Sequence, residues 1–162
     1  MTLHPERGRA FPEKAPVELD PIQRALQENE DWYRDLVEHS QDLLCIHDLQ
    51  GRLLSVNPAP ARVLGYSVEE LLQIPMREIL APEYRYQFDW YLNEIRETGE
   101  SLGLMVVVAR SGERRIWEYH NTLRTEGIAS PIVRGIAHDV TERRRYERHC
   151  TNTRGWWKVW MK

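Results

Sequence analysis

The stretch LLCIHDLQGRLLSVNP (residues 43–58) predicts a β-hairpin that runs directly into a helix. Residues 43–47 are a short, mostly apolar run with a period of two, which predicts a strand. The residues after Gly51 predict the return strand. Asp48 and Gly51 favour a tight turn between them, because Asp binds the local backbone and glycine tolerates positive φ. Asn57 is the expected N-cap of the helix, and Pro58 suits its first turn.

Upstream of the hairpin, residues 20–39 predict a flanking helix. Apolar side chains recur there at helical spacing, and Asp20 followed by Pro21 suits a helix start. The helix carries a stripe that is a candidate face for a dimer or a partner helix, formed by Ile22, Leu26, Tyr33 and Val37. Residues 1–19 hold three prolines and no hydrophobic period, which predicts a flexible arm.

Downstream of the hairpin, the pattern predicts short helices and then three strands. Gly65 ends the first short helix, and Ser67 with Glu70 forms a capping box that opens a second one. A longer helix is expected from Pro82 to Thr98. The strands are expected at 104–109, 116–123 and 132–138, followed by a charged helix from Glu142 to His149. This order of elements favours an α+β fold with an antiparallel sheet.

The composition excludes several classes of protein. With 22 Lys and Arg against 25 Asp and Glu, the net charge of −3 argues against direct binding of nucleic acid, whose partners are usually basic. No stretch approaches the roughly 18 apolar residues of a membrane span, and the N-terminus lacks the apolar core of a secretory signal. Cys45 and Cys150 are far apart, which argues against a paired-cysteine metal motif and fits the reducing cytoplasm.

Five short motifs, in this order and spacing, resemble the PAS domains (PAS/PAC modules) of bacterial signal-transduction proteins such as histidine kinases. They are His47-Asp48-Leu49-Gln50-Gly51-Arg52, Val56-Asn57-Pro58-Ala59, Leu64-Gly65-Tyr66-Ser67-Val68-Glu69-Glu70-Leu71, Arg110-Ser111-Gly112-Glu113 and Gly135-Ile136-Ala137-His138-Asp139-Val140-Thr141-Glu142-Arg143. The resemblance covers about residues 31–145. It implies a PAS fold, with a five-stranded antiparallel sheet, short helices on one face and flanking helices at both ends. Such domains often hold a small ligand and often dimerise.

The resemblance and the patterns together divide the chain into five parts. They are a flexible arm (1–19), an N-terminal flanking helix (20–39), a PAS core (40–139), an exit helix (140–150) and a tail (151–162). The tail holds three of the six tryptophans of the chain. We interpret it as a truncated or altered, disordered terminus, and an aromatic docking tail is the alternative.

Two cofactor subtypes of the family require residues that this chain lacks. The photochemical flavin subtype needs a reactive cysteine where the chain has Met76, and a thioether cannot supply thiolate chemistry. The oxygen-sensing haem subtype uses a helix histidine where the chain has Phe88, which offers no lone pair to iron. His47 is left as a pH sensor or as a metal or haem ligand, but a histidine at the core edge with one hydrogen bond is the favoured interpretation. The cofactor therefore stays unknown.

The inner face of the expected sheet has the composition of a small-ligand pocket and equally that of a filled core. The filled core is favoured, because Trp117 and Tyr119 are large enough to occupy the space themselves. The candidate pocket-lining residues are Cys45, His47, Met76, Phe88, Met105, Val107, Trp117, Tyr119, Asn121 and Ala137. His120 and His138 are expected to face away from the pocket, so no metal site is expected.

These features favour a non-catalytic module that senses a small-molecule, redox or partner signal and relays it to an effector, such as a histidine kinase. The relay candidates are Asp139, Thr141 and Glu142, where the last strand becomes the exit helix. A homodimer is the expected assembly, and no membrane partner is expected. The alternative is a ligand-free dimerisation or interaction module. An enzyme is disfavoured, because the sequence has no phosphate-binding glycine loop, nucleophile elbow or HExxH motif.

Overall fold

The computed structural model describes residues 20–150, with side chains described as far as residue 147. The arm expected at 1–19 and the tail expected at 151–162 lie outside the described residues. The chain falls into two units, one ending at Arg34 and the other beginning at Asp35.

The N-terminal helix α1 extends over Pro21–His39. It opens with a hydrogen bond of 2.9 Å from the backbone N–H of Arg24 to the carbonyl of Asp20. Large apolar side chains along it are exposed, namely Ile22, Leu26, Trp32, Tyr33, Leu36 and Val37.

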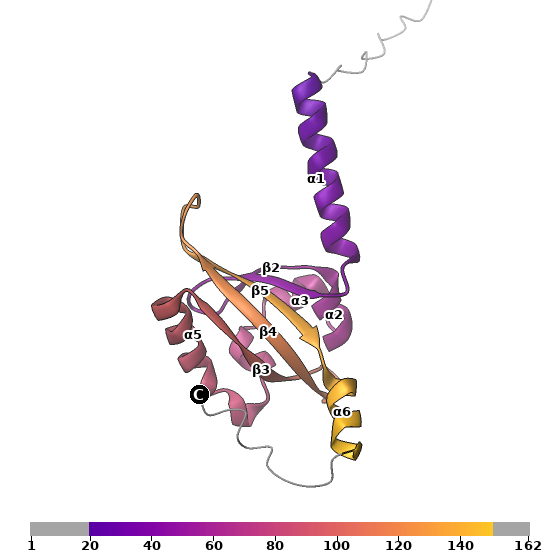
Figure 1. The fold of residues 1–162 in the computed structure, drawn as a ribbon, viewed down its shortest axis with the longest axis vertical. Coiled ribbons are helices and arrows are strands. Elements are labelled where there is room, and N and C mark those ends of the chain that lie inside the picture. Colours follow the sequence, from indigo (N-terminus) through magenta and orange to yellow (C-terminus); the bar gives the residue numbers. More distant parts are fainter. Residues whose placement is uncertain (1–19, 151–162) are drawn as a thin grey trace, which may run out of the picture. The chain divides into compact units, whose positions relative to one another are not determined.

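A five-stranded antiparallel sheet forms the body of the second unit (Figure 1). Its strands are β1 (Leu43–His47), β2 (Leu53–Val56), β3 (Glu100–Val108), β4 (Arg114–Arg124) and β5 (Ile132–Asp139). The spatial order is β2-β1-β5-β4-β3, so the last strand lies in the centre between the first and the fourth. The α+β fold class and the PAS topology expected from the sequence are thereby confirmed.

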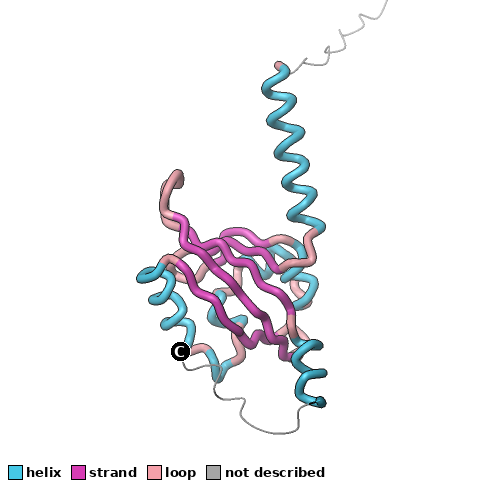
Figure 2. The backbone as a smooth tube through the Cα atoms, viewed as in Figure 1, coloured by secondary structure: helices cyan, strands magenta, loops and turns pink. Residues whose placement is uncertain are grey.

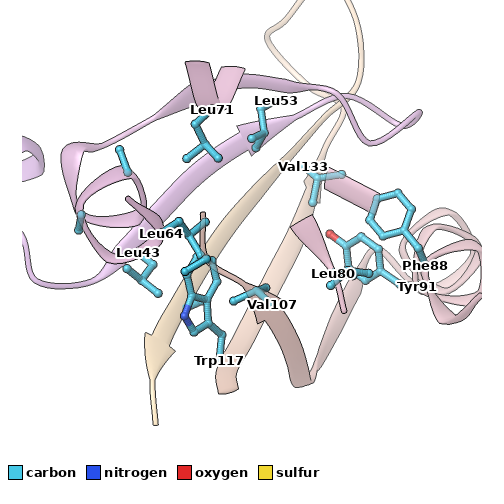
Figure 3. Close-up of a cluster of buried hydrophobic side chains, with 14 of the residues drawn as sticks. Leu43, Leu53, Leu64, Leu71, Leu80, Phe88, Tyr91, Val107, Trp117 and Val133 are labelled. Atoms are coloured by element: carbon cyan, nitrogen blue, oxygen red, sulfur yellow. The ribbon is translucent and has the colours of Figure 1, made fainter. Parts of the chain in front are cut away.

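Short helices between β2 and β3 cover one face of this sheet (Figure 2). They are α2 (Pro58–Leu64), α3 (Val68–Leu72), α4 (Met76–Ile79), the 3-10 turn η1 (Pro82–Tyr84) and α5 (Gln87–Thr98). Their apolar side chains form one core with the inner face of the sheet, in which Leu64, Leu71 and Val107 are each 1% exposed (Figure 3). Helix α6 (Thr141–Cys150) follows β5 almost directly.

The turn of the first hairpin depends on a glycine, as its sequence predicts. Gly51 has a φ of +80°, and a Cβ added there would lie 2.5 Å from the Phe88 ring. The Asp48 carboxylate accepts hydrogen bonds of 2.9 Å from the backbone N–H groups of Gln50 and Arg52. Any larger residue at position 51 would be strained and would displace the phenyl ring from the core.

The two predicted helix caps behave differently. Ser67 accepts from the Glu70 backbone N–H, and the Glu70 carboxylate accepts from the Ser67 N–H, so the predicted capping box is present. Asn57 occupies the expected N-cap position of α2, with Pro58 in the first turn, but its side chain makes no cap hydrogen bond. Its amide instead accepts from the Leu44 N–H and donates to the carbonyls of Val37 and Asp42. Hydrogen bonds from the Asn57 amide to backbone groups distant in sequence thus replace a local cap.

The single helix expected from Pro82 to Thr98 is divided in the structure. The backbone N–H groups of Arg85 and Phe88 bond to carbonyls three residues earlier, which is the spacing of a 3-10 turn. The Arg85 side chain meanwhile donates to the carbonyls of Glu78 and Leu80. The regular α-helix therefore begins only at Gln87 and ends at Gly99, whose φ of +81° terminates it.

Candidate functional site

A cavity of about 110 Å³ lies between the inner face of the sheet and the short helices. Among the described residues that line it, none carries a charged side chain. Nine of the ten pocket candidates from the sequence lie on its wall: Cys45, Met76, Phe88, Met105, Val107, Trp117, Tyr119, Asn121 and Ala137. Trp117 and Tyr119 therefore leave open space beside them.

The sheet side of the cavity includes two small residues of the central strand. Gly135 and Ala137 lie on the central strand β5, while their register partners on β4 are Asn121 and Tyr119. A Cβ added at Gly135 would lie 2.7 Å from the Cys45 Sγ and 2.9 Å from the Asn121 Oδ1. The Cys45 and Asn121 side chains thus occupy the space over Gly135, and both of them line the cavity.

A chain of buried hydrogen bonds forms part of the site. His47 is 0% exposed, and its Nδ1 lies 2.7 Å from the carbonyl oxygen of Asp48. Its Nε2 lies 2.7 Å from the Tyr91 hydroxyl, which in turn lies 2.7 Å from the Asn121 Nδ2. We call this chain, from His47 through Tyr91 to Asn121, the tyrosine network.

The chemistry of its members assigns every proton in the tyrosine network. A carbonyl oxygen only accepts, so the Nδ1 of His47 carries the proton and donates it to Asp48. The Nε2 of the neutral imidazole then accepts from the Tyr91 O–H, and the Tyr91 oxygen accepts from the Asn121 amide. Each donor of the chain therefore faces an acceptor, and no member needs a charge.

Burial keeps the groups around the cavity uncharged. Burial lowers the pKa of His47, against the smaller opposing effects of the Asp48 carbonyl and carboxylate. Burial also raises the pKa of the Tyr91 hydroxyl. It raises the pKa of the Cys45 thiol to about 11, although a backbone hydrogen bond at Gly135 opposes this. Cys45 is consequently a thiol and not a reactive thiolate at neutral pH.

Two members of the tyrosine network differ from the pocket candidates predicted from the sequence. His47, taken as a pocket residue, is not among the residues that line the cavity, because its imidazole packs against the Tyr91 ring with 5.8 Å between the ring centroids. Tyr91 lines the cavity and was not a candidate. The signal that indicates it is its spacing of three residues from Phe88, which places both on the inner face of α5.

The start of α6 is bonded to residues near the start of β4. The Thr141 Oγ1 accepts a hydrogen bond of 2.9 Å from the Ile116 backbone N–H and donates to the Asp139 Oδ1. That carboxylate oxygen also accepts from the Thr141 backbone N–H at 2.9 Å. The Arg115 guanidinium reaches the other Asp139 oxygen at 3.1 Å. We call this group of contacts the junction.

Charged side chains extend the junction along α6. Glu113 pairs with Arg115 at 3.1 Å and with Arg145 at 3.3 Å, and Arg145 also pairs with Glu142 at 2.8 Å. Burial lowers the pKa of Arg115, but the neighbouring carboxylates of Asp139 and Glu113 outweigh it and raise that pKa. The three relay candidates Asp139, Thr141 and Glu142 are thus brought into one bonded cluster with β4.

The remaining candidates lie apart from the cavity. His120 pairs with Glu100 and His138 with Asp42, and both imidazoles are more than half exposed. Within residues 20–147, no group of three or more His, Cys, Asp and Glu side chains is placed to hold a metal ion. None of the helices in the described part of the chain is long and apolar enough to cross a membrane.

Comparisons with known proteins agree with this geometry. The sequence profile of the PAS fold family matches residues 37–145. Sporulation kinase E of Bacillus subtilis (strain 168) is 25% identical over 126 residues, which cover 78% of this chain and 17% of that protein. The methyl sulfide methyltransferase-associated sensor of Methanosarcina acetivorans is 26% identical over 136 residues, covering 82% of this chain and 14% of that protein. The chain thus spans less than a fifth of the length of these relatives.

Solved structures are similar over the same region. A domain of the sensory box sensor histidine kinase/response regulator from Geobacter sulfurreducens is 28% identical with a TM-score of 0.59, covering 70% of this chain and 96% of that domain. The PAS domain of an HTR-like protein from Haloarcula marismortui is 21% identical with a TM-score of 0.64, covering 73% and 97%. The second likeness supports the fold alone.

Proposed function

The chain belongs to the PAS family, and from this premise we propose that it is a non-catalytic module that senses a small molecule and relays the signal to an effector. The carrying observation is that one strand, β4, contributes residues to both the cavity and the junction. Trp117, Tyr119 and Asn121 of β4 line the cavity. The preceding residues, Arg115 and Ile116, hold the start of α6 through Asp139 and Thr141.

The proposed mechanism moves the start of β4 relative to α6. A ligand in the cavity presses on Trp117, whose register partner on β5 is Asp139. Because Ile116 and Thr141 share a hydrogen bond, a shift of β4 changes the geometry at the first turn of α6. The ligand acts only to the extent that it binds one arrangement of the junction better than the other.

The proposed effector is a histidine kinase or another signalling output. Support comes from the relatives, which are named as a kinase and as sensors and are much longer than this chain. The kinase activity belongs to those proteins, and the module acts on such a domain from the same or another chain. We place it in the cytoplasm, where an unpaired thiol such as Cys45 stays reduced.

A ligand screen with an exchange readout tests sensing and relay separately. We expect a thermal-shift screen of small metabolites to find a stabilising compound, with an absorbance spectrum of the purified protein testing for a bound chromophore. In the wild type the compound should change amide hydrogen exchange in residues 141–147. In Thr141→Val it should still stabilise the protein but leave that exchange unchanged, because the hydroxyl bonded to Ile116 and Asp139 is gone.

The matched control is Thr122→Val, which makes the same substitution at a threonine of β4 outside the junction. This variant should keep the full exchange response of the wild type. If ligand binding alters exchange in α6 equally in Thr141→Val and in the wild type, the junction does not carry the relay. If no compound stabilises the protein, the sensing function is contradicted.

A ligand-free dimerisation module is the second candidate, supported by the exposed stripe of α1. Ile22, Leu26, Tyr33 and Val37 lie at helical spacing and are 43–76% exposed. In this case Leu26→Ala should weaken a dimer measured by light scattering, whereas Glu28→Ala on another face of α1 should not. A chain that is monomeric at high concentration, with or without ligand, excludes this function.

A further inference from the structure

We propose that the cavity takes an uncharged, mostly apolar small molecule with one hydrogen-bond acceptor, and that the Trp117 indole N–H binds this acceptor. This inference rests on the proposed function of the cavity as a ligand site, and it adds the chemical class of the ligand. The class follows from three properties of the cavity wall: an unused donor, the absence of charge and the available volume.

The unused donor is the Nε1 of Trp117. The Trp117 side chain is 8% exposed, and this nitrogen has no hydrogen-bond partner among the described residues. Figure 3 shows the nitrogen turned toward Leu43, which also lines the cavity. The nitrogen itself is buried, so an acceptor in the cavity reaches it after a small shift of the side chains beside it. Leaving a buried N–H without an acceptor costs free energy, and this cost favours such a shift.

The hydroxyl groups of Tyr91 and Tyr119 in the wall already have partners. The Tyr91 hydroxyl donates to His47 and accepts from Asn121. The Tyr119 hydroxyl lies 3.3 Å from the Ser101 Oγ. Of the buried side-chain nitrogen and oxygen atoms without a partner in the described part of the chain, only Trp117 Nε1 belongs to a residue that lines the cavity. An incoming acceptor therefore finds its donor at Trp117.

The wall selects against charged ligands. No Asp, Glu, Lys, Arg or His is among the described residues that line the cavity. The Cys45 thiol is neutral at physiological pH, so it offers no countercharge either. An anion or a cation would lose its hydration on entry and gain no opposite charge, which makes binding unfavourable.

The volume restricts the size of the ligand. An apolar protein cavity of about 150 Å³ holds benzene. A cavity of about 110 Å³ therefore suits a molecule of about six heavy atoms or fewer, before any movement of the helices. Cyclopentanone meets all three criteria. Methylcyclopentane has a similar shape without the acceptor, and butyrate has a similar size with a negative charge.

The test follows the indole N–H signals of the ¹⁵N-labelled full chain by NMR while each of these three compounds is added. Trp117→Phe identifies the Trp117 signal, and Trp90→Phe is the control at an exposed tryptophan. With cyclopentanone, we expect the Trp117 signal to move downfield and to saturate. We expect methylcyclopentane to bind about fivefold more weakly, since it lacks one hydrogen bond, and butyrate not to bind. Trp117→Phe should remove the preference for cyclopentanone, and Trp90→Phe should keep it.

Each contrary outcome has its own meaning. Equal affinity for cyclopentanone and methylcyclopentane would overturn the role of the Trp117 N–H while leaving the cavity as a ligand site. Tighter binding of butyrate would overturn the uncharged class. If none of the compounds moves the Trp117 signal and the metabolite screen also finds no ligand, the proposed sensing function fails as well. The three compounds are compared in the wild type, so the ranking of their affinities stands even if Trp117→Phe does not fold. In that case the Trp117 signal is identified by sequential resonance assignment of the wild type.

Discussion

The cavity and the junction lie next to each other on β4 and β5 but are held together by different forces. Trp117 belongs to the cavity wall, and its register partner Asp139 belongs to the junction. The cavity is uncharged, and its tyrosine network joins neutral donors to neutral acceptors. The junction and its extension along α6 join three carboxylates to two guanidinium groups, of which Asp139 and Arg115 are the less exposed pair at 20% and 27%.

This difference gives the proposed detection and the proposed relay different physical bases. Burial and shape decide what the cavity accepts, and salt has little effect on neutral buried groups. Salt screens the partly exposed charges of the junction, so its contribution should fall as ionic strength rises. Substitutions in the two regions should therefore differ in magnitude, in reach along the chain and in salt dependence.

The largest effect is expected from Tyr91→Phe in the tyrosine network. Removing the hydroxyl leaves both the His47 Nε2 and the Asn121 amide without a partner in the interior. We expect a loss of about 2–4 kcal/mol in the free energy of unfolding, because each buried group loses its compensation. Urea unfolding at low and high NaCl should give the same loss.

The control for this variant is Tyr86→Phe, since Tyr86 is 55% exposed on the same helical region. It should change the free energy of unfolding by less than about 0.5 kcal/mol. A loss in Tyr91→Phe that shrinks in high salt would contradict the neutral assignment of the network.

The next effect is expected from Gly135→Ala beneath the cavity. The new Cβ would meet the Cys45 Sγ at 2.7 Å and the Asn121 Oδ1 at 2.9 Å, so the two side chains must shift. We expect a loss of about 1–3 kcal/mol from this overpacking, measured by urea unfolding. Gly103→Ala is the matched strand glycine, where the nearest atom is the Tyr119 hydroxyl oxygen at 3.2 Å. If Gly103→Ala costs as much as Gly135→Ala, close packing over β5 does not shape the cavity.

A smaller and more local effect is expected from Asp139→Ala at the junction. The substitution removes the acceptor of the Thr141 backbone N–H and the ion pair with Arg115. We expect a loss of about 1 kcal/mol, as for a lost helix cap, and faster amide exchange in residues 140–149. The loss should decrease at high NaCl. Unchanged exchange in this segment would show that Asp139 does not hold α6.

The smallest effect expected is a pH dependence that separates the two regions. Because burial lowers the pKa of His47 below its ordinary value of 6.5, the unfolded chain takes up this proton first as the pH falls. The stabilising contribution is thus complete above about pH 6.5 and is lost progressively below it, down to the folded-state pKa. Unfolding free energies at pH 7.5 and 6.0 should therefore differ.

His47→Gln is the control, because glutamine does not titrate and its side-chain oxygen can still accept from Tyr91. Its unfolding free energy should change less between pH 7.5 and 6.0 than that of the wild type. An identical change in both proteins would show that His47 and the tyrosine network do not cause the pH dependence.

Local signals in the sequence were sufficient for much of the fold. The Gly51 turn and the Ser67 capping box each depend on residues a few positions apart, so their patterns were readable. The pattern at Asn57 predicted a local cap, but its side chain bonds to distant backbone groups instead. These groups are the Leu44 N–H and the Val37 carbonyl. Strand β3 starts at Glu100, earlier than its apolar residues indicate, because pairing with β4 extends it.

The site was only partly readable for a related reason. The alternation of side chains in strands placed Cys45, Trp117 and Asn121 on one face, and all three line the cavity. The alternation of side chains within a strand does not predict contacts between distant elements. The contact of the Tyr91 hydroxyl with His47, 44 positions earlier, was therefore missed. Sequence also favoured a core filled by Trp117 and Tyr119, whereas the structure has a cavity of about 110 Å³ beside them.

The sequence by itself determined the order of the elements, the turns and caps that depend on nearby residues, and the inner face of each strand. These properties follow from backbone preferences and from the two-residue period of a strand, which act locally. Only the tertiary structure decided the cavity, the protons of the tyrosine network and the unpaired Trp117 N–H. These depend on side chains from β1, α5 and β4 meeting over the small residues of β5, and no local pattern specifies such meetings.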